Sequence, residues 1–261
     1  MKFIRLLLLS FIFSTIACQK HEVAISKPIY SLTANEVDSI LNKKASSSKN
    51  YGKSIGVFGG SLSVIPESQS AKDAWRKYLN VQITDYGVSG YGFSSLQGSI
   101  QTEVDKATSL DIYILWASTN DYNNNRECGI PTDYTSADGY DKSKLITQCG
   151  GINYCISRLR SINPKATIYF FLSLPFFSNE SGYNADSKTV NSTGYNFAHY
   201  IAMQKECCKN NSIPYLDQFE LGLINFNNYT VYYQADNLHL NSTGYALIGK
   251  YQTLFLSDIS Y

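Results

Sequence analysis

Short apolar runs alternate with longer amphipathic stretches along most of this chain. The apolar runs are rich in β-branched and aromatic residues and stop at turn-forming residues, as buried strands do. They lie at Ser54–Phe58, Val81–Tyr86, Asp111–Ala117, Ala166–Leu172 and Ile213–Leu216. Apolar residues at helical spacing follow them, at Ala71–Leu79, Ser94–Ala107, Ile152–Ser161, Gly194–Lys209 and Thr243–Leu256. This alternation predicts one α/β domain over residues 51–261, a three-layer α/β/α sandwich with a central, mainly parallel sheet of about five strands.

The first residues of the chain have the pattern of an export signal. Lys2 and Arg5 precede the apolar run Leu6–Ala17, which is shorter than the roughly 20 residues that cross a bilayer. We therefore expect residues 1–17 to be a signal peptide. The small residues before Cys18 resemble a bacterial lipobox, so Cys18 is expected to become a lipidated N-terminus. The alternative is ordinary signal-peptide cleavage that leaves Cys18 unmodified.

The next segment, residues 18–50, is mainly polar and ends in a serine-rich stretch. We expect it to be a tether with one short helix near Ala34–Leu41. No later segment is apolar over enough residues to predict a transmembrane helix. The sequence therefore predicts an exported, periplasmic or cell-surface protein that is attached to a membrane only through a lipid on Cys18.

Composition narrows the kinds of partner and site. The net charge is +1 and no run of Lys or Arg stands out, so the chain lacks the basic surface of a nucleic-acid-binding protein. The chain has only three histidines, which argues against a His-rich metal site. Six cysteines are too few for a disulfide scaffold. Cys128 and Cys149 bracket one long insertion, and either a disulfide bridge or two buried free thiols would fit this spacing.

Four polar segments carry groups suited to nucleophilic catalysis. Ser61 follows the first predicted strand, Gly90 lies in a glycine-rich turn after the second, and Asn120 follows the third. Asp236 and His239 stand three residues apart, just before the last predicted helix. At that spacing a carboxylate can hold the imidazole Nδ1–H and leave Nε2 free as a base. Each segment alone also fits a capped helix start or a plain turn, but a nucleophilic serine needs all of these groups together.

In this order, the segments around Ser61, Gly90, Asn120 and Asp236–His239 resemble the SGNH (GDSL-type) hydrolase family over about residues 53–255. The resemblance implies a flavodoxin-like fold and ester hydrolysis through an acyl-serine. Ser61 would be the nucleophile, His239 the base, and Asp236 the group that orients it. The oxyanion hole would consist of the backbone N–H groups of Ser61 and Gly90 and the side-chain amide of Asn120. The resemblance implies no metal or organic cofactor.

Two positions depart from the pattern of this family. Gly60 stands where the family usually has Asp, and Ser118 stands where it usually has Gly. The nucleophile, base and acid are all present. We therefore expect the changes at Gly60 and Ser118 to affect only how well the turns around the site are ordered. The G-x-S-x-G and H-E-x-x-H motifs of other hydrolases are absent from the sequence.

The expected export and two long insertions indicate the kind of substrate. The insertions are rich in Asn, Gly, Tyr and Ser and cover residues 121–148 and 175–192. Both insertions follow strand ends, where α/β sheets place ligand sites. We expect a monomeric esterase that removes a small acyl group, such as acetate, from a small molecule or a glycan. Two alternatives remain open: an acyltransferase with the same site, and a non-catalytic glycan-binding lipoprotein on this fold.

Overall fold

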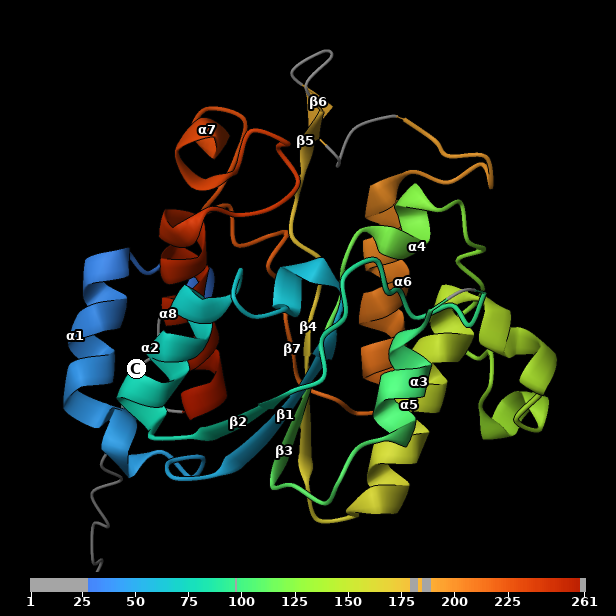
Figure 1. Ribbon diagram of the computed structural model, residues 1–261, viewed down its shortest axis with the longest axis horizontal. Coiled ribbons are helices and arrows are strands. Elements are labelled where there is room, and N and C mark those ends of the chain that lie inside the picture. Colours follow the sequence, from blue (N-terminus) through green and yellow to red (C-terminus); the bar gives the residue numbers. More distant parts are fainter. Residues whose placement is uncertain (1–27, 97, 179–182, 185–188, 259–261) are drawn as a thin grey trace, which may run out of the picture.

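A parallel sheet forms the centre of the computed structural model (Figure 1). The structure describes residues 28–96, 98–178, 183–184 and 189–258. The strands are β1 (Ser54–Gly59), β2 (Gln82–Asp85), β3 (Ile112–Trp116), β4 (Thr167–Phe171) and β7 (Tyr215–Leu216). They lie side by side in the order β2-β1-β3-β4-β7, and every neighbouring pair is parallel. The predicted three-layer sandwich around a five-stranded, mainly parallel sheet is therefore confirmed.

Helices cover both faces of the sheet, because the strands are apolar on both sides. One face carries α1 (Ala34–Lys44), α2 (Gln69–Leu79) and α8 (Ser242–Ser257), and the other carries α3 (Ile100–Asp105), α5 (Gln148–Ile162) and α6 (Phe197–Asn210) (Figure 1). Successive residues of β3 enter opposite layers: Trp116 lies in the first core and Leu115 in the second. Two short helices, α4 (Asn120–Asn123) and α7 (Tyr229–Tyr232), and the hairpin of β5 (Phe177–Ser178) and β6 (Tyr183–Asn184) complete the described elements.

The folded unit begins earlier than the sequence suggested. Helix α1, in the segment expected to be a tether, buries Val37 and Leu41 completely in the first core. A capping box between Thr33 and Glu36 fixes its start. Since Leu32 is also part of this core, residues 32–50 belong to the domain. The expected signal peptide and Cys18 lie outside the described residues. Within the described part of the chain, no helix is both long and apolar enough to cross a membrane.

The starts of α3 and α5 differ most from those that the sequence pattern indicated, and α6 begins three residues later than expected, at Phe197. Helix α3 begins only after Ser99, whose hydroxyl accepts a hydrogen bond from Gln101 N–H at 3.1 Å, and residues 94–96 and 98–99 are not helical. Helix α5 begins earlier, at Gln148, and includes two glycines that obscured its start in the sequence. A Cβ at Gly151 would collide with the carbonyl oxygen of Phe93. Glycine here lets α5 pack closely against the loop that precedes α3.

The described cysteines are free thiols, and all five are buried: Cys128, Cys149, Cys155, Cys207 and Cys208. The alternative of a bridge between Cys128 and Cys149 is therefore not what the structure contains. Hydrogen bonds with the thiols of Cys128 and Cys207, together with burial, raise the pKa of the Cys149 thiol. The protonated thiols act here as small apolar side chains in the second core.

Candidate active site

Ser61 lies on a tight turn directly beyond β1. A short 3-10 helix, Ser61–Ser63, follows Gly60, and the Ser63 hydroxyl donates a hydrogen bond to the Gly60 carbonyl oxygen at 2.9 Å. A Cβ at Gly59 would lie 2.5 Å from the carbonyl oxygen of Trp116 on the neighbouring strand. The glycines before Ser61 therefore let the chain turn sharply against β3 and place the serine at the carboxyl edge of the sheet.

A continuous hydrogen-bond chain links Ser61, His239 and Asp236. His239 Nε2 lies 2.8 Å from Ser61 Oγ, and its Nδ1 lies 2.6 Å from Asp236 Oδ2. The other carboxylate oxygen, Oδ1, accepts the backbone N–H groups of Leu238 and His239, each at 3.0 Å. This arrangement assigns the Nδ1–H tautomer and points the unprotonated Nε2 at the serine hydroxyl. The structure thus brings together three residues that the sequence placed at opposite ends of the domain.

The carboxyl group of Asp236 is suited to remain ionised. Burial alone would raise its pKa, but hydrogen bonds from the His239 ring and from two backbone N–H groups outweigh burial and hold the pKa below its usual range. The Asp236 side chain is 46% exposed and that of His239 is 26% exposed. Water therefore reaches Asp236, at the outer end of the hydrogen-bond chain, while Ser61, at its inner end, is more enclosed.

The loop that carries Asp236 and His239 is fastened to its surroundings. Gln234 N–H donates to the His239 carbonyl oxygen at 2.7 Å, and Phe177 N–H donates to the carbonyl oxygen of Asn237 at 2.9 Å. Asn237 has a φ of +54°, a conformation that Asn tolerates better than most residues. The first bond closes the loop on itself, and the second ties the loop to β5, so the backbone that carries His239 is fixed in place.

Asn120 begins α4 directly beyond β3, and its amide is aimed by a backbone carbonyl. Its Nδ2 donates to the Tyr91 carbonyl oxygen at 2.8 Å, and the Ser118 hydroxyl donates to the same oxygen at 3.3 Å. A Cβ at Gly60 would lie only 2.6 Å from this Nδ2. The amide therefore lies against the residue before Ser61, and its second hydrogen remains for a ligand. Sequence reasoning missed the Tyr91 carbonyl, because no side chain marks it.

Gly90 lies in the loop after β2 with a φ of +83°, which favours glycine. No group in the described part of the chain accepts a hydrogen bond from its N–H. Gly90 and Asn120 both line a cavity of about 360 Å³, together with Ser89, Tyr91, Gly92, Ser94, Gly98, Asp121, Asn124 and Arg126. Two of the three expected oxyanion donors, Gly90 and Asn120, therefore line one polar cavity.

Asp121, next to Asn120, fixes the loop that leads to Gly90. It is buried, and its carboxylate accepts the N–H groups of Phe93 at 2.8 Å and Ser94 at 3.0 Å. Burial raises the pKa of Asp121, and these two hydrogen bonds oppose that rise. A Cβ at Gly92 would collide with the carboxylate. The loop between β2 and α3 therefore folds around the Asp121 carboxylate.

Asp121→Ala is expected to lower the free energy of unfolding by about 2–6 kcal/mol, because two buried N–H groups would lose their acceptor at roughly 1–3 kcal/mol each. Urea unfolding followed by circular dichroism measures this change. Asp121→Asn retains one acceptor and is expected to lose less. An alanine variant as stable as the wild type would show that the loop does not depend on the carboxylate.

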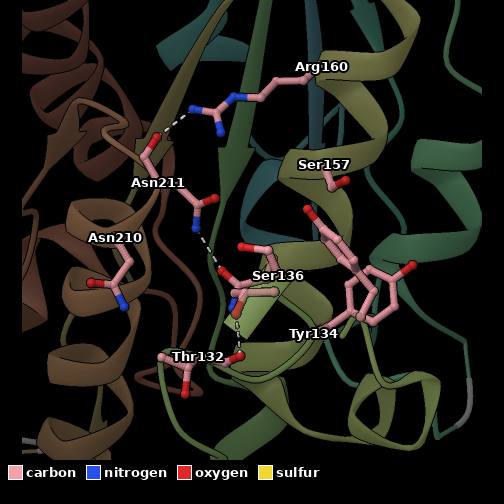
Figure 2. A pocket seen from close by; sticks show the side chains of 10 residues that line it. Thr132, Tyr134, Ser136, Ser157, Arg160, Asn210 and Asn211 are labelled. Carbon is pink, nitrogen blue, oxygen red and sulfur yellow. Dashed lines mark hydrogen bonds between the residues drawn. The ribbon is translucent and has the colours of Figure 1, made fainter. Parts of the chain in front are cut away.

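A separate cavity of about 530 Å³ lies between the insertion of residues 121–148, helix α5 and the end of α6 (Figure 2). Its lining includes Thr132, Tyr134, Arg160 and Asn211, and Arg160 donates to the Asn211 carbonyl oxygen. None of the residues that line it belongs to the Ser61 site. The cavity at Gly90 and Asn120, not this larger one, is therefore the candidate binding cleft.

A parallel sheet with a serine, a histidine and a carboxylate in hydrogen-bond contact at its carboxyl edge defines the class of α/β serine hydrolases. Comparison with known families gives the narrower group: residues 55–247 match the model of the GDSL-like lipase/acylhydrolase family. The chain therefore belongs to this family, which consists of serine hydrolases of ester bonds.

Solved structures share the fold at low sequence identity. A protein from Lactobacillus plantarum is 19% identical, with a TM-score of 0.66 over 79% of this chain and 97% of its own. A protein from Bacteroides ovatus described as a GDSL-like lipase is 18% identical, with a TM-score of 0.57 over 80% and 99%. One from Chitinophaga pinensis described as a possible lipase is 17% identical, with a TM-score of 0.57 over 77% and 96%. No curated protein matches the sequence.

Proposed function

We propose that this protein is an exported serine esterase that removes a small acyl group, such as acetyl, from a carbohydrate hydroxyl through an acyl-serine intermediate. The observation that carries the proposal is the hydrogen-bond chain from Asp236 through His239 to Ser61, at 2.6 and 2.8 Å. A serine hydroxyl is a weak nucleophile unless a base accepts its proton as it attacks. The imidazole is placed and oriented for that step.

In the first half of the reaction, Ser61 Oγ bonds to the ester carbonyl carbon while His239 Nε2 takes the hydroxyl proton. The carbonyl electron pair moves onto the oxygen, where the backbone N–H groups of Ser61 and Gly90 and the Asn120 amide stabilise the negative charge. Asp236 stabilises the imidazolium. When the carbonyl re-forms, the ester C–O bond breaks and the alcohol leaves with the proton from His239. Water then attacks the acyl-serine with the same base and releases the acid.

The polar cavity beside the oxyanion donors supports a hydroxyl-rich alcohol as the leaving group. Its lining residues include Ser89, Tyr91 and Asn124, which carry hydroxyl and amide groups. A long acyl chain would need an apolar groove, and this lining offers hydrogen-bonding groups instead. The N-terminal export pattern supports a substrate outside the cytoplasm. Lipidation of Cys18 and a monomeric state are part of the proposal.

The proposal predicts that a fluorophosphonate labels the purified protein once, at Ser61, and that Ser61→Ala is not labelled. Labelling reports an activated serine whatever the natural acyl group is. Mass spectrometry of the intact protein and of its peptides gives the stoichiometry and the position. Ser161→Ala, on the exposed end of α5, is the matched control and should be labelled like the wild type.

Hydrolysis of p-nitrophenyl acetate and release of acetate from acetylated oligosaccharides then test the substrate. A wild type that is neither labelled nor active would overturn the proposal and favour a glycan-binding role. Labelling with transfer of acetate to an added sugar, and no free acetate, would show an acyltransferase instead.

A further inference from the structure

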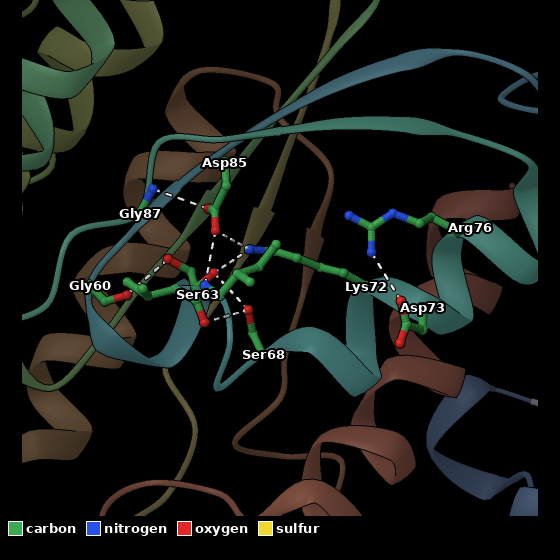
Figure 3. Close-up of polar contacts among 10 residues, drawn as sticks. Gly60, Ser63, Ser68, Lys72, Asp73, Arg76, Asp85 and Gly87 are labelled. Carbon is green, nitrogen blue, oxygen red and sulfur yellow. Dashed lines mark hydrogen bonds and ion pairs between the residues drawn. The ribbon is translucent and has the colours of Figure 1, made fainter.

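A lysine with no exposed surface lies beneath the nucleophile turn. Lys72, on α2, has a fully buried side chain. Its Nζ lies 2.9 Å from Asp85 Oδ2 and also donates to the carbonyl oxygen of Ser63 (Figure 3). Lysine is almost never fully buried unless it is paired. The side chain therefore reaches from the helix layer to a point two residues beyond Ser61.

Asp85, at the end of β2, joins two loops of the candidate active site. Besides Lys72, its carboxylate accepts the N–H of Ile65 at 3.0 Å and the N–H of Gly87 at 3.2 Å. Ile65 belongs to the loop that follows Ser61, and Gly87 begins the loop that carries Gly90. A single carboxylate thus holds the nucleophile loop and the oxyanion loop to one another.

Ser63 is the point where these contacts meet. Its carbonyl oxygen accepts Lys72 Nζ and the hydroxyl of Ser68, and its own hydroxyl donates to the Gly60 carbonyl oxygen (Figure 3). A Cβ at Gly87 would lie 2.6 Å from Ser63 Oγ. The two loops are therefore in direct contact, with no space for either to shift towards the other.

Stability alone is a poor explanation for this buried ion pair. Burial lowers the pKa of Lys72, and the neighbouring carboxylate of Asp85 opposes that shift. Desolvation of the buried lysine and of the partly buried carboxylate offsets much of their attraction, and apolar replacements of similar volume are often neutral or stabilising for buried pairs. What an apolar pair could not supply is the set of hydrogen bonds to Ser63, Ile65 and Gly87.

We infer that Lys72 and Asp85 are positioning residues for the esterase reaction: their ion pair sets the place of Ser61 relative to the oxyanion donor Gly90. The inference rests on the proposed function. Neither side chain touches the substrate. Displacement of a reacting group by about 1 Å costs on the order of 10² in rate, so the pair acts on kcat through the geometry of the two loops.

Two double variants test this inference without burying an unpaired charge. Lys72→Met/Asp85→Asn retains one acceptor for the loop N–H groups, whereas Lys72→Met/Asp85→Leu retains none. For p-nitrophenyl acetate we expect kcat to fall by about 10²-fold in the leucine variant, and by less in the asparagine variant. KM should change little. The leucine variant should melt at a lower temperature than the wild type, because the N–H groups of Ile65 and Gly87 lose their acceptor, and the asparagine variant should lose less. Fluorophosphonate labelling of Ser61 should slow in the same order.

The control is a second ion pair far from the site. Lys250 Nζ on α8 lies 2.6 Å from Asp38 Oδ2 on α1, and Lys250→Met/Asp38→Asn should keep the wild-type kcat. Wild-type kcat in a folded Lys72→Met/Asp85→Leu variant would overturn the inference while leaving the proposed function intact. If that variant does not fold, wild-type kcat in the asparagine variant would overturn it. A wild type without activity or labelling would instead overturn the proposed function.

Discussion

Replacement of His239 by alanine is expected to lower kcat for ester hydrolysis by about 10⁴–10⁶-fold, the range seen when a serine hydrolase loses its base. The ring is the only described group placed 2.8 Å from Ser61 Oγ to take its proton. It also returns a proton to the leaving alcohol, so both halves of the reaction would suffer. Steady-state kinetics with p-nitrophenyl acetate measures the loss, and thermal unfolding should show little change because the ring lies partly exposed.

His199 offers a matched control for this variant. It lies on α6, where its half-buried ring stacks on Tyr195 at a centroid distance of 4.1 Å. His199→Ala should therefore retain wild-type kcat. Asp236→Asn should lose activity too, but less than His239→Ala, since the imidazole itself remains. Full activity of His239→Ala would show that the base is another group.

Gly60→Asp, which restores the residue usual in the family, is expected to lower kcat by at least about 10²-fold instead of improving it. A Cβ at this position would lie 2.6 Å from Asn120 Nδ2, 2.7 Å from the Tyr91 carbonyl oxygen and 2.8 Å from Ser118 Oγ. The aspartate would push the oxyanion amide away from Ser61. Comparison of kcat with KM checks this, since the loss should appear mainly in kcat.

Ser118→Gly should restore part of the activity of Gly60→Asp, because it frees space into which the Tyr91 carbonyl and the Asn120 amide can shift. Gly60→Ala should be nearly as impaired as Gly60→Asp, since the collision begins at Cβ. If Gly60→Asp were fully active, the Asn120 amide could not be an oxyanion donor in the observed position. Rescue by Ser118→Gly would show that the side chains at residues 60 and 118 compete for one space beside the Asn120 amide.

Much of the fold was predictable because buried parallel strands leave continuous apolar runs. β3 and β4 were found within one residue at each end for this reason. The spacing of Asp236 and His239 similarly predicted their mutual contact. Helix α1 was harder to place in the domain, since Val37 and Leu41 are its only fully buried residues and most of its other residues are polar.

The parts of the site that escaped prediction are made by the backbone or by tertiary contact. The Tyr91 carbonyl that aims Asn120 has no side-chain signature. Lys72 occupies the buried face of the helix predicted at Ala71–Leu79, but nothing local pairs it with Asp85, which lies on a different strand. The contact between Ser61 and His239 joins residues 178 positions apart, so only the fold or the family resemblance could bring them together.

The five buried thiols also have a consequence for how this protein is made. In the folded domain they are shielded within the core, with the pKa of the Cys149 thiol raised, so oxidants meet little reactive thiolate. An unfolded chain offers no such shield, and the adjacent Cys207 and Cys208 could then form incorrect bridges. The proposed export would make this protein fold in an oxidising compartment, where formation of the second core would have to outpace disulfide formation. Under that proposal, the speed of folding protects the thiols.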